Sequence, residues 1–249
     1  MTDYTAQGGR LMYLGGNGWF WTGGEDPAFP GAYETRNFSA IGERMLTNGQ
    51  VGGLQVETGR TPGPVVGLEM AAMIWNGASA FEKLPHAENP RASWIFDGTR
   101  EGGTFGAYGI DSVRGGAAGF ETDKFNPDNG TPRHALHLAT NTEMAKKLEN
   151  VKLGTLPLAI SYDPPTPNWA GADIVFFETA NGGAVFSAGS ITWMSSTPEN
   201  GYNNDVAQIT RNVIARFLDP TPFPAIPADE VDEVDRVPSN PEYEHADQQ

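Results

Sequence analysis

A short apolar run that breaks into a glycine-rich loop constrains the fold of this chain more than any other feature. The run at residues 11–14 is followed by Gly15-Gly16-Asn17-Gly18 and then by three aromatic residues. Apolar residues bounded by glycine predict a buried strand. Glycines just past a strand let the backbone approach a ligand, and open α/β sheets bind ligands at the carboxyl ends of their strands. We therefore expect an α/β fold with a ligand site at residues 15–18.

The position of this strand predicts a partner. Only nine residues, mostly polar or small, precede Arg10, whereas a buried parallel strand ordinarily follows another strand and a crossover helix. An unpaired strand edge is also a template for aggregation. We expect the strand at 11–14 to be covered on both faces and paired by another polypeptide, with Asn17 facing a cavity shared between the chains.

Composition indicates a loop-rich α/β or α+β protein. The 249 residues are 39% hydrophobic and include 31 glycines and 19 prolines, unlike a helical bundle. The absence of cysteine excludes disulfides, cysteine-ligated metal and a cysteine nucleophile. No apolar run approaches the roughly 18 residues needed to cross a bilayer, and no secretory signal pattern opens the chain. These observations predict a cytoplasmic protein.

Much of the net charge of −15 lies near the C-terminal end. Residues 229–249 contain eight acidic residues and a single lysine or arginine, Arg236. Such a tail is expected to be disordered or to lie as a strap over a neighbour. A chain this acidic is a poor candidate for binding nucleic-acid phosphates. We divide the chain into a lead at 1–7, an α/β domain at 8–220 and a tail at 221–249.

Hydrophobic patterns predict the remaining elements. Strands are expected at residues 33–36, 92–96, 134–139, 173–178 and 184–188, the last two forming a hairpin around Asn181-Gly182-Gly183. A short helix is expected at 142–150, and residues 65–75 fit either a strand or a helix. A longer helix is expected to begin at Asn203, Asn204 or Asp205 and to end at Asp219-Pro220. Its buried face would contain Val206, Ile209, Val213, Ile214 and Phe217.

The loop at 15–18 differs from the phosphate-binding glycine motifs. No Gly-Lys-Ser/Thr follows it, and the spacing Gly-x-Gly-x-x-Gly is absent. The Asn17 amide can donate to a substrate carbonyl or to a developing oxyanion. The alternative is a plain turn, in which asparagine tolerates a positive φ. Both interpretations stay open on these residues alone.

Glu121 is the candidate for proton transfer. It ends the almost uncharged stretch 115–120, which predicts a partly buried carboxylate with a raised pKa, suited to general-base catalysis. Asp123 and Lys124 follow at once, so Glu121 can equally mark the protein surface.

Other residues are weaker candidates. His134 and His137 are three apart in a predicted strand, so their side chains face opposite ways and are unsuited to one metal. His86 lies in a proline-flanked loop and is expected to be solvated. Ser195-Ser196 has no adjacent histidine in the sequence and no Gly-x-Ser-x-Gly elbow is present, which disfavours a serine hydrolase. Trp19-Phe20-Trp21 can wall a small apolar pocket.

Five motifs, in order along the chain, carry a family resemblance. They are Gly-Gly-Arg-Leu-Met-Tyr-Leu-Gly-Gly-Asn-Gly at 8–18, Gly-Gly-Ala-Ala-Gly-Phe-Glu at 115–121, Gly-Thr-Pro-Arg-His-Ala-Leu at 130–136, the segment 176–193 that begins Phe-Phe-Glu-Thr-Ala-Asn-Gly-Gly, and Asn-Gly-Tyr-Asn-Asn-Asp-Val at 200–206. Together they resemble the N,N-dimethylformamidase large (β) subunit family. The resemblance runs from residue 8 to about residue 219 and leaves out the acidic tail.

The resemblance implies an amidohydrolase that cleaves the C–N bond of N,N-dimethylformamide and related small amides. It implies a fold like that of class I glutamine amidotransferases, flavodoxin-like α/β with added β-hairpins, lacking their catalytic cysteine. In the family a mononuclear iron is held by two tyrosines and by the glutamate of a His-Pro-Glu-Tyr segment just upstream of the strand at 11–14. Residues 1–7 contain no such segment. The resemblance therefore covers only the C-terminal half of that domain, and no metal ligand is expected in this chain.

The resemblance also implies roles for individual residues. Asn17 would polarise the amide, Glu121 would transfer protons, and the family's basic residue after the loop falls near Arg36. The substrate-binding residues would be Gly16, Gly18, Trp19 and Phe20. The family's Phe-Tyr-Trp appears here as Trp-Phe-Trp, without the tyrosine hydroxyl.

A partner would complete the site. The iron ligands would come from another subunit that carries the upstream half-domain, in a hetero-oligomer. The alternatives are a scaffold or binding subunit that keeps the fold without the metal site and, less well supported, a carbohydrate-binding module.

Overall fold

The computed structural model describes residues 1–19, 21–35, 45–46, 48–50, 52, 61–108, 115–141, 159–161 and 171–226. The predicted helix at 142–150, the acidic tail from residue 227 onward, and the candidate site residues Phe20 and Arg36 lie outside these ranges. Within them, no helix is long and apolar enough to span a bilayer.

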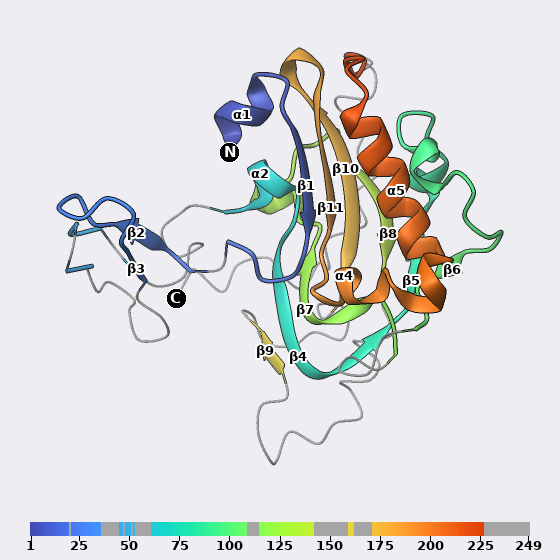
Figure 1. The fold of residues 1–249 in the computed structure, drawn as a ribbon, viewed down its shortest axis with the longest axis horizontal. Coiled ribbons are helices and arrows are strands. Elements are labelled where there is room, and N and C mark those ends of the chain that lie inside the picture. The colour runs from blue at the N-terminus through green and yellow to red at the C-terminus, as the bar shows by residue number, and fades with distance from the viewer. Residues whose placement is uncertain are drawn as a thin grey trace, which may run out of the picture.

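A six-stranded sheet forms the body of the protein (Figure 1). Its order is β1 (Arg10–Leu14), β11 (Gly183–Ala188), β10 (Asp173–Thr179), β8 (Leu136–Thr140), β5 (Phe81–Lys83) and β6 (Thr104–Phe105). β1 runs parallel to β11, and the other neighbouring pairs are antiparallel. The mixed α/β class expected from the sequence is confirmed, and the flavodoxin-like amidotransferase fold stays a prediction.

The β10–β11 hairpin forms where the sequence predicts it. Asn181 in the connecting turn η5 (Ala180–Gly182) has a φ of 59°, a left-handed conformation that asparagine tolerates better than most residues. Phe176 and Phe186 oppose each other across the hairpin and are fully buried with Trp193 in the main core. The turn residues and the apolar strand residues therefore both favour the same hairpin.

A second sheet meets the end of the first. Its order is β7 (Ala118–Lys124), β4 (Glu69–Ser79) and β9 (Ala159–Ser161), and β4 curves toward β5 of the main sheet (Figure 1). An isolated bridge joins Thr122 to Ser190, and the Asp123 amide donates to the Gly189 carbonyl at 2.9 Å. These contacts fix β7 beside the carboxyl ends of β1 and β11. A separate small hairpin pairs β2 (Gly23–Glu25) with β3 (Tyr33–Thr35), close to the strand predicted at 33–36.

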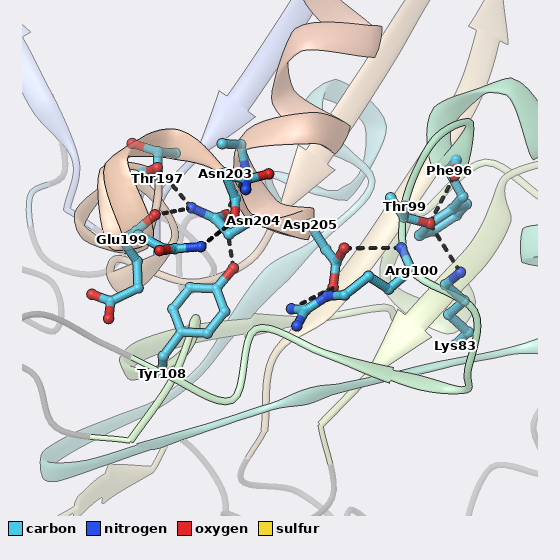
Figure 2. Close-up of polar contacts among 12 residues, drawn as sticks. Lys83, Phe96, Thr99, Arg100, Tyr108, Thr197, Glu199, Asn203, Asn204 and Asp205 are labelled. Atoms are coloured by element: carbon cyan, nitrogen blue, oxygen red, sulfur yellow. Dashed lines mark hydrogen bonds and ion pairs between the residues drawn. The ribbon is translucent and has the colours of Figure 1, made fainter.

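One long helix, α5 (Asp205–Leu218), covers a face of the main sheet (Figure 1). Asn204, one of the three predicted caps, begins it, because its Oδ1 accepts the Ala207 amide at 2.9 Å. Tyr108 donates its hydroxyl to the same oxygen at 2.7 Å, and Asp205 binds Arg100 (Figure 2). This end of the helix is therefore tied to the loops on either side of β6.

The buried face of α5 is narrower than predicted. Val206, Ile209 and Val213 are buried and Phe217 packs partly buried against the core, as expected. The prediction for Ile214 is wrong, since its side chain is 44% exposed. One residue after Val213, it is rotated about 100° around the helix and points away from the sheet.

The other helices among the described residues are short. They are α1 (Thr2–Ala6), α2 (Gly63–Val66), α4 (Thr192–Ser196), and the 3-10 turns η2 (Pro85–Glu88), η3 (Ser93–Phe96), η4 (Pro127–Asn129) and η6 (Glu199–Tyr202). The strand predicted at 92–96 is wrong. Trp94 Nε1 donates to the Arg91 carbonyl at 2.9 Å and the Ile95 amide donates to the Ala92 carbonyl, so local turn bonds replace a strand ladder. The ambiguous stretch 65–75 contains both the end of α2 and the start of β4.

The prediction that β1 is covered on both faces is confirmed only in part. Leu11 and Tyr13 pack against a small apolar cluster around Val66 on one face, and Met12 and Leu14 pack against the main core on the other. All five residues of β1 are nevertheless only half-buried, and within the described residues β1 lies at the edge of the main sheet. β11 of this chain pairs with one side of it. Among the described strands none pairs with the other side, and pairing there by another polypeptide stays a prediction.

Candidate functional site

The loop after β1 packs directly on the backbone of β7. Gly16 lies so close to Glu121 that a Cβ atom on Gly16 would overlap the Glu121 carbonyl group. Only glycine allows this approach. The structure thus brings the Gly15-Gly16-Asn17-Gly18 loop and Glu121, more than 100 residues apart in the sequence, to one place at the carboxyl end of β1.

Tyr13 and Asp123 fix the backbone of this loop through hydrogen bonds. The Tyr13 hydroxyl donates to Asp123 Oδ2 at 2.6 Å, and the Asn17 backbone amide donates to Asp123 Oδ1 at 2.8 Å. The Gly18 amide donates in turn to the Tyr13 hydroxyl oxygen at 2.8 Å. A Cβ atom on Gly18 would stand 2.6 Å from that oxygen, so glycine at this position lets the hydroxyl reach the backbone.

Burial sets the protonation of this pair. Asp123 is 2% exposed, and burial raises its pKa to about 7, against the lowering effect of the hydrogen bonds from Tyr13 and Asn17. The negative charges of Glu121 and Glu69 raise it further. Burial and the Asp123 charge also raise the pKa of Tyr13 far above its ordinary value. Tyr13 is therefore a neutral hydrogen-bond donor throughout the physiological pH range.

The Asn17 side-chain amide is buried without a hydrogen-bond partner among the described residues. The Asn17 backbone has a φ of 56°, so the turn conformation expected for asparagine is present. Its amide oxygen and nitrogen are shielded from solvent, and neither has a hydrogen-bond partner among the described residues. Buried amide groups are ordinarily paired. Within the described residues, the arrangement therefore leaves the Asn17 amide nitrogen and oxygen without a hydrogen-bond partner.

Glu121 is half-buried at an irregular point of β7. Burial raises the pKa of its carboxyl group, as predicted from the sequence. The preceding Phe120 has a φ of 66°, where the register of β7 against β4 shifts. Trp19, on the facing loop, has a φ of 62°. Bulky residues adopt such conformations at a cost, and strained backbone of this kind often accompanies functional sites.

The predicted site residues fall into two groups. Asn17, Gly16, Gly18 and Glu121 come together as described, and Trp19 lies on the same loop, 37% exposed. Phe20 and Arg36 are outside the described residues. Sequence reasoning missed Tyr13 and Asp123. A signal for Asp123 was present, because it stands two residues from Glu121 on one strand and such residues share a face.

The three histidines among the described residues lie near different groups and not on the loop at 15–18. His134 Nε2 is 2.9 Å from the Glu178 carbonyl oxygen, and His137 Nε2 is 3.2 Å from Asp173 Oδ1. His86, expected to be solvated, is half-buried and accepts the His137 amide at 3.1 Å, because η2 packs on β8. No group of three histidine, aspartate or glutamate side chains in the described part of the chain is arranged to hold a metal.

A separate cleft of about 560 Å³ lies at the other end of the β1–β11 pair. Its lining includes the turn Ala180-Asn181-Gly182, which precedes β11, whereas the Asn17 loop follows the last residue of β1. Beside the cleft, Arg91 forms a buried ion pair with Glu178 and donates to the His134 carbonyl at 3.0 Å. This cleft is remote from Asn17 and Glu121.

Comparison with known proteins identifies relatives of this chain. A family described as "N,N-dimethylformamidase beta subunit-like, C-terminal" matches residues 1–204. The N,N-dimethylformamidase beta subunit of Paracoccus aminophilus is 34% identical over 237 residues, and that of an Alcaligenes species is 32% identical over 237 residues. Each alignment covers 90% of this chain and 30% of the relative. The chain thus spans about a third of the length of these curated relatives.

Proposed function

The chain belongs to the N,N-dimethylformamidase beta subunit-like, C-terminal family, and we propose that it forms part of an enzyme that hydrolyses small N-substituted amides. The relatives' names support N,N-dimethylformamide as the substrate. Water would add to the formyl carbon, and cleavage of the C–N bond would give formate and dimethylamine. The name beta subunit also supports a complex with other subunits.

The Asn17 side-chain amide, which has no partner among the described residues and follows the glycine that packs on the Glu121 backbone, is the observation that carries this proposal. A tertiary formamide offers one strong acceptor, its carbonyl oxygen, and no N–H donor. Asn17 Nδ2 would donate to that oxygen and stabilise the negative charge that develops on it. The Asn17 amide is already free of protein partners among the described residues, so binding would break no hydrogen bond within them.

Glu121 would handle the protons. Its half-buried carboxyl group has a raised pKa, which suits a group that takes a proton from water and returns it to the departing amine. Trp19 would wall the site against bulk water. Gly16 and Gly18 would act through their backbones, because both let other groups approach where a side chain would obstruct them. The roles of Phe20 and Arg36 stay predictions from the resemblance.

The described residues show no ready cluster of histidine and carboxylate ligands. They contain no group of three histidine, aspartate or glutamate side chains that could hold a metal ion, and both oxygens of Asp123 already accept hydrogen bonds from Tyr13 and Asn17. We propose that the ligands of the mononuclear iron come from another polypeptide. The residues of this chain would then bind the amide and move protons beside it.

The proposal is tested with the complete assembly, purified with its partner subunits. We expect it to release formate and dimethylamine in equal amounts from N,N-dimethylformamide. Asn17→Ala should lower kcat by about 100-fold or more, the typical effect of removing an oxyanion donor. Asn212→Ala is the control, because it loses hydrogen bonds to the Ile95 and Asp97 carbonyls at α5, away from the loop. An active assembly indifferent to Asn17→Ala would instead support the scaffold interpretation.

A further inference from the structure

We propose that Tyr13 and Asp123 are positioning residues that hold the Asn17 loop in the one conformation that leaves the Asn17 amide free for a ligand carbonyl. This inference rests on the proposed function, since it assigns Asn17 its ligand. It concerns two residues that neither touch that ligand nor carry its protons.

The hydrogen bonds restrain the loop on both sides of the Asn17 side chain. Asp123 accepts the Asn17 amide at 2.8 Å, and Tyr13 accepts the Gly18 amide at 2.8 Å. The contact between Tyr13 and Asp123 at 2.6 Å joins the two acceptors into one unit. Two successive backbone amides are therefore fixed, and with them the direction in which the Cα–Cβ bond of Asn17 leaves the loop.

The loop needs this restraint because its backbone is strained. Asn17 and Trp19 both have positive φ values, and such conformations persist only where the surroundings determine them. Gly16 wedged against the Glu121 carbonyl supplies one constraint. The Tyr13–Asp123 pair supplies the other, from the opposite end of the loop.

Asp123 is unsuited to acid–base catalysis of its own. Its carboxylate is almost inaccessible, and each of its oxygens already accepts a hydrogen bond from the protein. Nor does it suit a role in stability alone, since burying a carboxylate between Glu121 and Glu69 disfavours its charged form. The Asp123 carboxyl group is costly to bury, and both of its oxygens bind Tyr13 and the loop at 15–18. We therefore assign Asp123 the role of holding that loop.

A double-mutant cycle with an independent structural readout tests this proposal in the complete assembly. Tyr13→Phe removes one hydroxyl and keeps the ring. We expect kcat for N,N-dimethylformamide to fall by about 10- to 100-fold through misplacement of Asn17, with a smaller change in KM. In an Asn17→Ala background, the same substitution should cost about 2-fold or less, because effects that act through one residue are not additive.

Hydrogen exchange separates this inference from the proposed function. Tyr13→Phe should increase deuterium uptake in the segment 14–19 whether or not the assembly hydrolyses this amide. Gly18→Ala, which would push the Tyr13 hydroxyl away, should do the same. The matched control is Tyr108→Phe, which loses a hydroxyl bonded at 2.7 Å to Asn204 and should change neither kcat nor uptake at 14–19.

Unchanged uptake at 14–19 in both variants would overturn the proposal, as would independent and additive effects of Tyr13→Phe and Asn17→Ala. Normal activity of Asn17→Ala would overturn the catalytic role of Asn17. If Tyr13→Phe and Gly18→Ala still increased uptake at 14–19, the structural restraint by Tyr13 and Asp123 would remain supported. The two failures are therefore distinguishable.

Discussion

Gly16 packs against the Glu121 carbonyl with no room for a single additional carbon atom. This contact joins the loop at the end of β1 to the strand that carries the candidate proton-transfer residue. It also gives a reason for the composition of the loop, because a close backbone approach is one of the few structural demands that only glycine meets.

Gly16→Ala is expected to lower kcat of the assembly by 100-fold or so, since displacement of groups in a site by about 1 Å can have that effect. The control is Gly15→Ala. A Cβ atom at Gly15 would meet only the Tyr13 ring, at 3.8 Å, and should be accommodated. Equal activities of the two variants, measured as dimethylamine release, would contradict the packing described here.

Asp123 should make the stability of the protein fall as the pH rises. Its folded-state pKa of about 7 lies above the ordinary value of 3.8, so between these values the folded state binds the proton more tightly than the unfolded state. The contribution of Asp123 is therefore most favourable near pH 4 and is lost as the pH approaches 7, by as much as a few kcal/mol. Asp123→Asn should flatten this part of the pH profile.

The measurement is the free energy of unfolding by urea at several pH values from 5 to 8. Asp128→Asn, at an exposed position in η4, is the control and should keep the wild-type profile. If Asp123→Asn also keeps the wild-type profile, the Asp123 carboxyl is not shielded as the structure shows.

Substitution of the Arg91–Glu178 pair tests the packing beside the cleft at the turn Ala180-Asn181-Gly182. Both side chains are at most 10% exposed, and breaking a buried pair leaves one charge uncompensated. Glu178→Gln is expected to destabilise the protein by about 3 to 5 kcal/mol in urea unfolding. By contrast, Arg211→Ala removes an exposed arginine that donates to the Tyr202 carbonyl and to Gln208, and it should cost less than about 1 kcal/mol. Similar costs for both would show that the Arg91–Glu178 pair is not buried.

Metal analysis addresses the origin of the iron. The isolated chain is expected to bind iron well below one equivalent, because its described residues offer no group of three histidine, aspartate or glutamate side chains that could hold a metal ion. The complete assembly should contain about one iron per copy of this chain. One tightly bound iron in the isolated chain would contradict ligands supplied by another polypeptide.

Local signals in the sequence predict part of this structure well. The turn around Asn181 and the capping residue Asn204 determine the β10–β11 hairpin and the start of α5 through contacts within a few residues. The segment 92–96 shows the opposite case. Its apolar composition favours a strand, but the Trp94 bond to the Arg91 carbonyl and the neighbouring turn bonds stabilise a 3-10 turn instead.

The candidate site was predictable only in part. Asn17 and Glu121 stand in glycine-rich surroundings that mark them in the sequence. The link between Tyr13 and Asp123 spans 110 residues, and no local pattern reports a contact of that kind. Tyr13 looks like one more member of an apolar run, and its hydroxyl gains a role only when β7 folds beside β1.

The central claim is that Glu121 carries protons in amide hydrolysis, and the most direct test is the kcat of the assembly reconstituted with Glu121→Gln. Loss of a general base typically costs about 100- to 10,000-fold in rate, so we expect a decrease in that range with the assembly intact. Glu82→Gln, at an exposed position of β5, should keep wild-type kcat. An intact Glu121→Gln assembly that retains more than about half of wild-type kcat, against the loss expected for a general base, would contradict the account.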